Sequence, residues 1–177
     1  MKLYRTRIPA IARMVIEEFA NDGSLEVLPE NRVEAETDLV AIMEEYLRRD
    51  MELRDAVREH MSTRGVPYDR YGKVRSAMAQ EAGHPTGNEV ERFLARQFVE
   101  NFMISRFIEE VFADDAALMK RIRTVLESFD VDETAIRDEA RDKVKNLEEG
   151  TVDYEIALSH AVKEVKKRHG LLVERSR

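Results

Sequence analysis

The feature that most constrains the fold of this 177-residue chain is an internal repeat. The segment ELRDAVREHM at 52–61 returns as AIRDEARDKV at 135–144, and the same offset of 83 positions holds along the chain without a gap. Identical residues are few, but the apolar positions keep one register through several segments. We therefore predict two tandem copies, 1–83 and 84–177, joined around AGHPTGN at 82–88 and packed together as one compact unit.

Apolar residues spaced three and four positions apart predict helices in both copies. The chain has seven glycines and four prolines, and 37 % of its residues are charged, which favours a mostly helical protein. The predicted helices are 6–21, 29–49, 50–64 and 68–82 in the first copy, and 88–112, 114–129, 132–148 and 152–169 in the second. The predicted fold class is all-α, with two similar four-helix copies related by an approximate two-fold axis and a short extended turn near Leu25–Val27.

The helix predicted over 88–112 carries apolar residues on more than one face. A helix of this kind is typically buried between layers, so we expect it at the seam between the copies. The first copy has the turn NDGSLEVL at 21–28, whereas the equivalent ISRFIEEV at 104–111 contains no glycine. We therefore predict that the helix continues or kinks there.

Composition excludes several classes of protein. The net charge of −7 disfavours a dedicated nucleic-acid binder, because phosphate binding is driven by clustered positive charge. The absence of cysteine excludes disulfides, zinc–thiolate sites and iron–sulfur clusters. MKLYRTRIPAIARM lacks the apolar region of a signal peptide, and no apolar run approaches the ~20 residues of a spanning helix. We expect a cytoplasmic protein that does not enter a membrane.

No catalytic or cofactor signature is present. The sequence has no phosphate-binding glycine loop and no serine-nucleophile motif. Only one of its four histidines, His84, follows a glutamate by three positions, whereas helix-bundle di-metal sites require two such motifs. DVDET at 130–134 is best interpreted as a helix start capped by Asp130 or Asp132. We expect no enzymatic activity, no metal and no cofactor.

Charged residues repeated in both copies are the first candidate site. An exposed pair within one helix contributes only about 0.3–0.5 kcal/mol, which hardly explains why the same charges stand in both copies. We therefore predict that they bridge helices within each copy; they are Arg13, Arg54, Asp55, Arg96, Arg137 and Asp138.

A dense positive cluster near the end of the chain is the second candidate: Lys163, Lys166, Lys167 and Arg168, with Arg175 and Arg177 beyond. Cations at a helix C-terminus complement the helix dipole, and this is the interpretation we favour. The alternative is a contact with nucleic acid or an acidic partner, extended by Arg70, Lys73 and Arg75.

Five segments resemble the tandem form of the bacterial "domain of unknown function 507" family: MKLYRTRIPAIAR, DGSLEV, IMEEYLR, ISRFIEEVFADD and EEGTVDYEIALSHAVKEVKKRHGLL. The resemblance supports the repeated architecture and implies no reaction, substrate or binding residue. Our leading hypothesis is a non-enzymatic helical protein-interaction or scaffold protein. The alternative is a nucleic-acid-associated regulator that uses the basic C-terminal helix. The sequence also allows the protein to form a homodimer.

Overall fold

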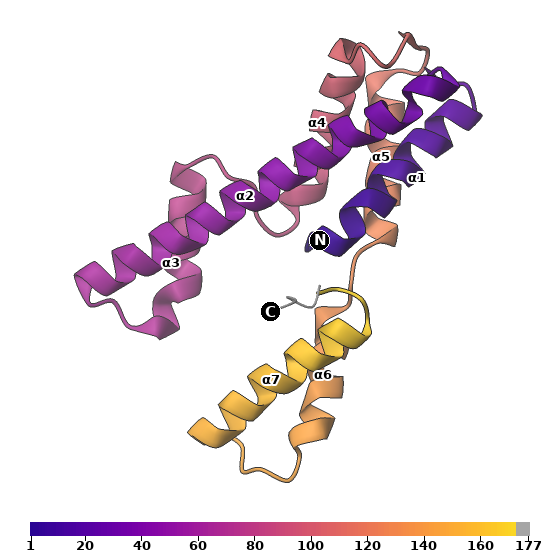
Figure 1. The fold of residues 1–177 in the computed structure, drawn as a ribbon. Helices are drawn as coiled ribbons and strands as arrows, with labels where there is room; N and C mark the ends of the chain where they lie inside the picture. Colours follow the sequence, from indigo (N-terminus) through magenta and orange to yellow (C-terminus); the bar gives the residue numbers. More distant parts are fainter. Residues whose placement is uncertain (173–177) are drawn as a thin grey trace.

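The computed structural model describes residues 1–172, and Figure 1 shows the course of the chain. About 73 % of the residues are helical, so the mostly helical class predicted from the sequence is confirmed. The α-helices are α1 (Ile8–Asn21), α2 (Arg32–Arg64), α3 (Tyr71–Glu81), α4 (Glu89–Ile104), α5 (Asp115–Ser128), α6 (Glu133–Val144) and α7 (Val152–Arg168). Two short strands, β1 (Leu25–Glu26) and β2 (Glu110–Val111), accompany them. None of these helices combines the length and the apolar character needed to cross a membrane.

Helices α1, α4 and α5 and the N-terminal half of α2 form a central bundle (Figure 1). Its core is drawn from both predicted copies, because residues between Leu3 and Tyr46 pack with residues between Val90 and Leu126. Among the largest side chains in it are Phe19 and Phe102, whose rings meet edge to face at 6.2 Å. This geometry is favourable for aromatic pairs, and it joins α1 to α4 at the centre of the bundle.

The two strands pair antiparallel at one end of the bundle, with Leu25 opposite Val111 and Glu26 opposite Glu110. The extended segment expected near Leu25–Val27 is therefore present in part, as β1. This two-stranded sheet joins the segment that precedes α2 to the segment that precedes α5.

Residues 1–83 contain three α-helices rather than the predicted four, because the helices expected at 29–49 and 50–64 are one continuous helix, α2. No glycine or proline interrupts this stretch. Its buried stripe continues through Tyr46, Asp50 and Leu53 at helical spacing, so packing also favours continuation. The helix ends at Gly65, which takes the left-handed conformation (φ 61°) that glycine tolerates best.

Two helical hairpins extend from the bundle in different directions (Figure 1). The C-terminal half of α2 packs on α3 around Leu53, Val57, Met61 and Ala79. Helices α6 and α7 pack chiefly on each other, around a separate core that contains Ile136, Ala140, Leu158 and Val165. Tyr4 from the N-terminal segment completes this second core. Each hairpin therefore has its own apolar cluster.

The helix predicted over 88–112 ends earlier than expected, at Ile104. Ser105 is extended, and its hydroxyl donates a hydrogen bond to Asp38 Oδ2 (2.7 Å) and accepts one from the Phe107 amide (3.3 Å). The chain then enters β2. The prediction that the helix continues was wrong, because a serine bonded to a distant carboxylate ends the helix where no glycine is available.

Candidate functional site

Asp50 is the most buried acidic side chain that we find at the centre of a polar cluster. It lies in the middle of α2 and is 4 % exposed. Arg75 Nη2, from α3, donates to its Oδ1 at 2.6 Å, and Arg54 Nη2, one turn along α2, lies 2.5 Å from its Oδ2. His84 Nε2 lies 3.5 Å from Oδ1. We call Asp50, Arg54, Arg75 and His84 the Asp50 cluster.

Within the Asp50 cluster, His84 packs against Tyr46. The two rings stack with their centroids 5.0 Å apart, and the Tyr46 hydroxyl donates a hydrogen bond to the Pro85 carbonyl (3.3 Å). Burial lowers the pKa of His84 even though Asp50 acts in the opposite direction. Burial, with a contribution from the charge of Asp50, raises the pKa of Tyr46 to about 12. Both rings are therefore neutral near pH 7, and the charge of Asp50 is balanced by arginine.

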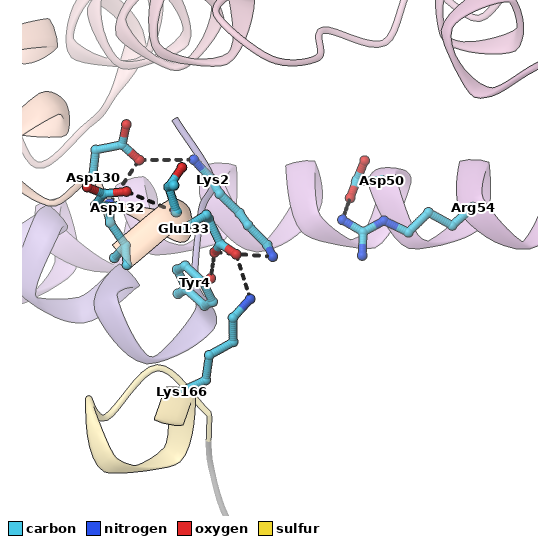
Figure 2. A network of polar contacts seen from close by, with 10 residues as sticks. Lys2, Tyr4, Asp50, Arg54, Asp130, Asp132, Glu133 and Lys166 are labelled. Atoms are coloured by element: carbon cyan, nitrogen blue, oxygen red, sulfur yellow. Dashed lines mark hydrogen bonds and ion pairs between the residues drawn. The ribbon is translucent and has the colours of Figure 1, made fainter. Parts of the chain in front are cut away.

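A second cluster surrounds Glu133, the residue 83 positions after Asp50, at the N-terminus of α6 (Figure 2). Lys166 Nζ donates to its Oε2 at 2.7 Å, Lys2 Nζ lies 3.3 Å from Oε1, and the Tyr4 hydroxyl donates to the same oxygen. Burial acts to raise the pKa of Glu133, but the bonds and charges of Lys166 and Lys2 outweigh it and the pKa is lowered. This Glu133 cluster joins the N-terminal segment to both helices of the second hairpin.

The repeated charges make contacts mostly within single helices. Arg54 pairs with Asp50, Asp55 with Arg58 (2.8 Å), Arg96 with Glu100 (3.8 Å) and Asp138 with Arg141 (3.0 Å), each pair lying within one helix. For these four residues the prediction of bridges between helices was wrong, because i,i+3 and i,i+4 partners were within reach.

Arg13 and Arg137 behave differently from the other repeated charges. Arg13 reaches from α1 to Glu36 on α2, at 3.9 Å and with its side chain 65 % exposed. Arg137 has no ion-pair partner among residues 1–172, since Glu133 is occupied by Lys2 and Lys166. Neither geometry describes a catalytic site.

The basic cluster on α7 is smaller at the surface than its sequence suggests. Lys163 and Lys167 are exposed, but the side chain of Lys166 is only 11 % exposed and is bonded to Glu133. Arg168 pairs with Glu139 on α6. Including Lys166 in a surface patch was therefore wrong, because its position on the buried face of α7 directs it inward. Arg175 and Arg177 lie outside the described residues.

The outer face of α7 carries an apolar pair. Val152 and Ile156, one turn apart, are 75 % and 54 % exposed, while Tyr154 and Leu158 on the opposite face pack against α6. With Gly150, Thr151, Glu155, Ser159 and His160 they line an open hollow of about 480 Å³. Leu147, in the hairpin turn, is 42 % exposed.

Sequence reasoning missed Lys2, Tyr4, Tyr46 and His84 as members of the two clusters. One signal was available for Asp50: it falls on the apolar stripe of its helix, between Tyr46 and Leu53. A carboxylate at such a position is rarely buried unless it is paired, so it predicts partners from another element. Among the described residues no group of three potential metal-ligating side chains is found.

A comparison with models of protein families matches this chain to one family. The model of a family described as "Protein of unknown function (DUF507)" matches residues 1–171. No curated protein matches the sequence.

Proposed function

The chain belongs to the DUF507 family of proteins of unknown function, and from this premise we propose that it is a non-enzymatic helical interaction protein. Its partner binds on the outer face of the second hairpin. The observation that carries the proposal is the exposed apolar pair Val152 and Ile156 on α7, a helix whose other face is already occupied by α6. Isolated exposed apolar residues need no explanation, but adjacent ones that line a hollow are typical of interaction surfaces.

The chemistry of this face fits an amphipathic helix of another protein. Val152 and Ile156 lie at i and i+4, which is the spacing at which one helix meets the apolar face of another. Glu155 and His160 at the edge of the hollow supply polar contacts around it. We assign no reaction, because the carboxylates of Asp50 and Glu133 already bond cations of the chain itself.

The two-copy architecture is part of the same proposal. The register of β1 and β2, extended by two residues, sets Leu28 opposite Ile108. Leu28 lies 83 positions before Val111, and Ile108 lies 83 positions after Leu25. The offset therefore exchanges this pair with the observed pair Leu25–Val111, as a two-fold axis through the two strands requires. Asp50 and Glu133, also 83 positions apart, each stand at the centre of a polar cluster. Both observations support duplication.

The test is affinity capture from native cells with three forms of the protein. We expect a partner to be enriched on the unmodified protein and reduced at least tenfold on the double variant Val152→Glu, Ile156→Glu, because a buried unpaired carboxylate is costly. Met51→Glu is the matched control, since Met51 is 59 % exposed on α2. Equal recovery on all three forms, or no enriched partner, would contradict the proposal.

The nucleic-acid-associated role ranks second. It rests on the exposed Lys163, and it is weakened because Lys166 and Arg168 are bonded within the molecule. Salt-dependent retention on heparin or DNA that is lost in Lys163→Gln, Lys167→Gln would favour this role over a protein partner.

A further inference from the structure

A groove of about 460 Å³ lies between the C-terminal half of α2, α3 and the N-terminal segment. Its lining includes four cationic side chains, Lys2, Arg54, Arg58 and Arg75. Lys2 is paired with Glu133 and Arg58 with Asp55, whereas Arg54 and Arg75 share the single carboxylate of Asp50. Three tyrosines, Tyr46, Tyr68 and Tyr71, also face it. In a chain with a net charge of −7, this local excess of positive charge points to an anionic ligand. We call it the Tyr–Arg groove.

Asp50 holds two of the guanidinium groups in place. Each of Arg54 and Arg75 uses one nitrogen, Nη2, to reach a different oxygen of this carboxylate. The side chains are 45 % and 28 % exposed, so the remaining N–H groups are available to a ligand. Two positive charges share one negative charge, and planar guanidinium groups bind phosphate oxygens in pairs. This arrangement suits a phosphate group.

The tyrosines supply a second kind of surface at the other end of the groove. Tyr68 is 81 % exposed, and its ring stacks on Tyr71 with centroids 5.6 Å apart. Tyr71 contacts the core of the first hairpin, so it supports Tyr68 from below. The outer face of Tyr68 is left open to an aromatic ligand, and stacking on an exposed aromatic ring is how proteins commonly hold nucleobases.

The groups that line the Tyr–Arg groove come from neighbouring turns of two packed helices. Asp50, Arg54 and Arg58 follow each other at successive turns of α2, so Arg54 and Arg58 are separated by roughly 6 Å along the axis. Tyr71 and Arg75 stand one turn apart on α3, which returns alongside α2. Arg75 is therefore about one helical turn from Tyr71, and Tyr68 stacks on Tyr71, so the cationic and aromatic groups line one groove.

We propose that the Tyr–Arg groove binds a nucleoside phosphate, with the phosphate on Arg54 and Arg75 and the base on Tyr68. A purely structural role accounts for the pairing of Asp50 with arginine. It does not account for the second positive charge beside this one carboxylate or for the exposed ring of Tyr68. A bound nucleotide uses both.

Isothermal titration calorimetry with AMP, ADP, adenosine and inorganic phosphate tests the proposal on the full chain. We expect saturable binding of AMP or ADP that is at least about tenfold tighter than binding of adenosine or of phosphate, because only the nucleotides engage both ends of the groove. A parallel series with CMP and UMP identifies any preference for the base. No saturable binding by any of these nucleotides would overturn the proposal.

Three variants locate the ligand. Arg54→Gln should weaken nucleotide binding about tenfold or more, since it removes a charge-assisted contact. Tyr68→Ala should weaken binding of the nucleotide but leave that of inorganic phosphate unchanged, and because Tyr68 is exposed this variant does not threaten folding. Arg123→Gln is the matched control, since Arg123 is 48 % exposed and paired with Glu127 one turn along α5.

The pattern of losses decides the outcome. Loss in Arg54→Gln and Tyr68→Ala, with normal binding in Arg123→Gln, supports the assignment. Equal affinity in all three variants places any nucleotide elsewhere and overturns it. A single-stranded oligonucleotide that binds in the Tyr–Arg groove while mononucleotides do not would overturn it as well.

Discussion

Asp50 and Glu133 lie 83 positions apart, and each is bonded to cations, at least one of which comes from another helix. Asp50 is held by arginines within the first hairpin, whereas Glu133 is held by lysines and a tyrosine that fasten the N-terminal segment to the second hairpin. A partly or fully buried carboxylate is stable only when it is paired, so losing one partner costs more than the same change at the surface. The two residues therefore organise polar contacts on which packing of the hairpins depends.

His84 makes stability depend on pH. Burial lowers its pKa below the ordinary value of 6.5, against the opposing effect of Asp50 and with smaller contributions from Arg49 and Arg75. The unfolded chain therefore binds this proton more readily, and stability falls as the pH drops through 6.5 toward the lower value of the folded protein.

We expect urea denaturation to give a lower free energy of unfolding near pH 5 than near pH 7.5, and a smaller difference in His84→Gln. Glu133 and Asp22, whose pKa values are lowered from 4.5 and 3.8, lose their contributions at more acidic pH. His160→Gln is the control, because His160 is exposed on α7. An unchanged pH profile in His84→Gln would contradict this assignment.

Helix α2 links the central bundle to the first hairpin without interruption. Its N-terminal half contributes Leu39 and Met43 to the bundle core, and its C-terminal half contributes Leu53 and Val57 to the hairpin core. Because the peptide hydrogen bonds continue through Asp50, the hairpin is held at a defined angle by the helix itself. The stretch 83 positions later is instead divided into α5 and α6, with Asp132 capping α6 through the amides of Thr134 (2.9 Å) and Ala135 (3.0 Å).

Met51→Pro tests the continuity of α2. In an unbroken helix proline removes a hydrogen bond and clashes with the preceding turn, so we expect a loss of about 3 kcal/mol or more and reduced helical circular dichroism. If a helix began at Met51, proline would occupy a first-turn position and be tolerated. Asp115→Pro, at the first position of α5, is the matched control and should be nearly neutral. Similar stability of both variants would indicate a break at Asp50.

The whole molecule combines one central bundle with two hairpins that have separate cores. The second hairpin is joined to the bundle by the connection from α5 to α6 and by the N-terminal segment, whose Tyr4 inserts into its core. Since few other contacts hold α6 and α7 against the bundle, this hairpin should open independently of it.

Tyr4→Ala should loosen the second hairpin selectively. Truncating a buried aromatic side chain costs about 3 kcal/mol, so amide hydrogen exchange in α6 and α7 should accelerate roughly a hundredfold while the slowest amides of α4 and α5 are unchanged. Met14→Ala, at a residue 44 % exposed on α1, serves as the control. Uniform acceleration throughout the chain would show that the hairpin and the bundle unfold together.

Parts of the candidate sites were readable in the sequence and parts were not. The i,i+4 pair of Asp50 and Arg54 follows from helical spacing, as does the cap by Asp132. Arg75 reaches Asp50 from 25 residues away, and Tyr4 reaches Glu133 from 129 residues away. No local pattern marks such partners. The inward position of Lys166 was missed for the same reason, since its bond to Glu133 depends on how α6 and α7 pack.

The sequence by itself determined that the chain is mostly helical and where most of its helices lie, because apolar periodicity and helix caps act within a turn or two of the backbone. Only the tertiary structure decided that α2 is continuous and that α4 ends at Ile104. The end of α4 depends on a hydrogen bond from Ser105 to Asp38, 67 residues away. The contacts involved join residues far apart in the sequence, so no local pattern of apolar residues or caps encodes them.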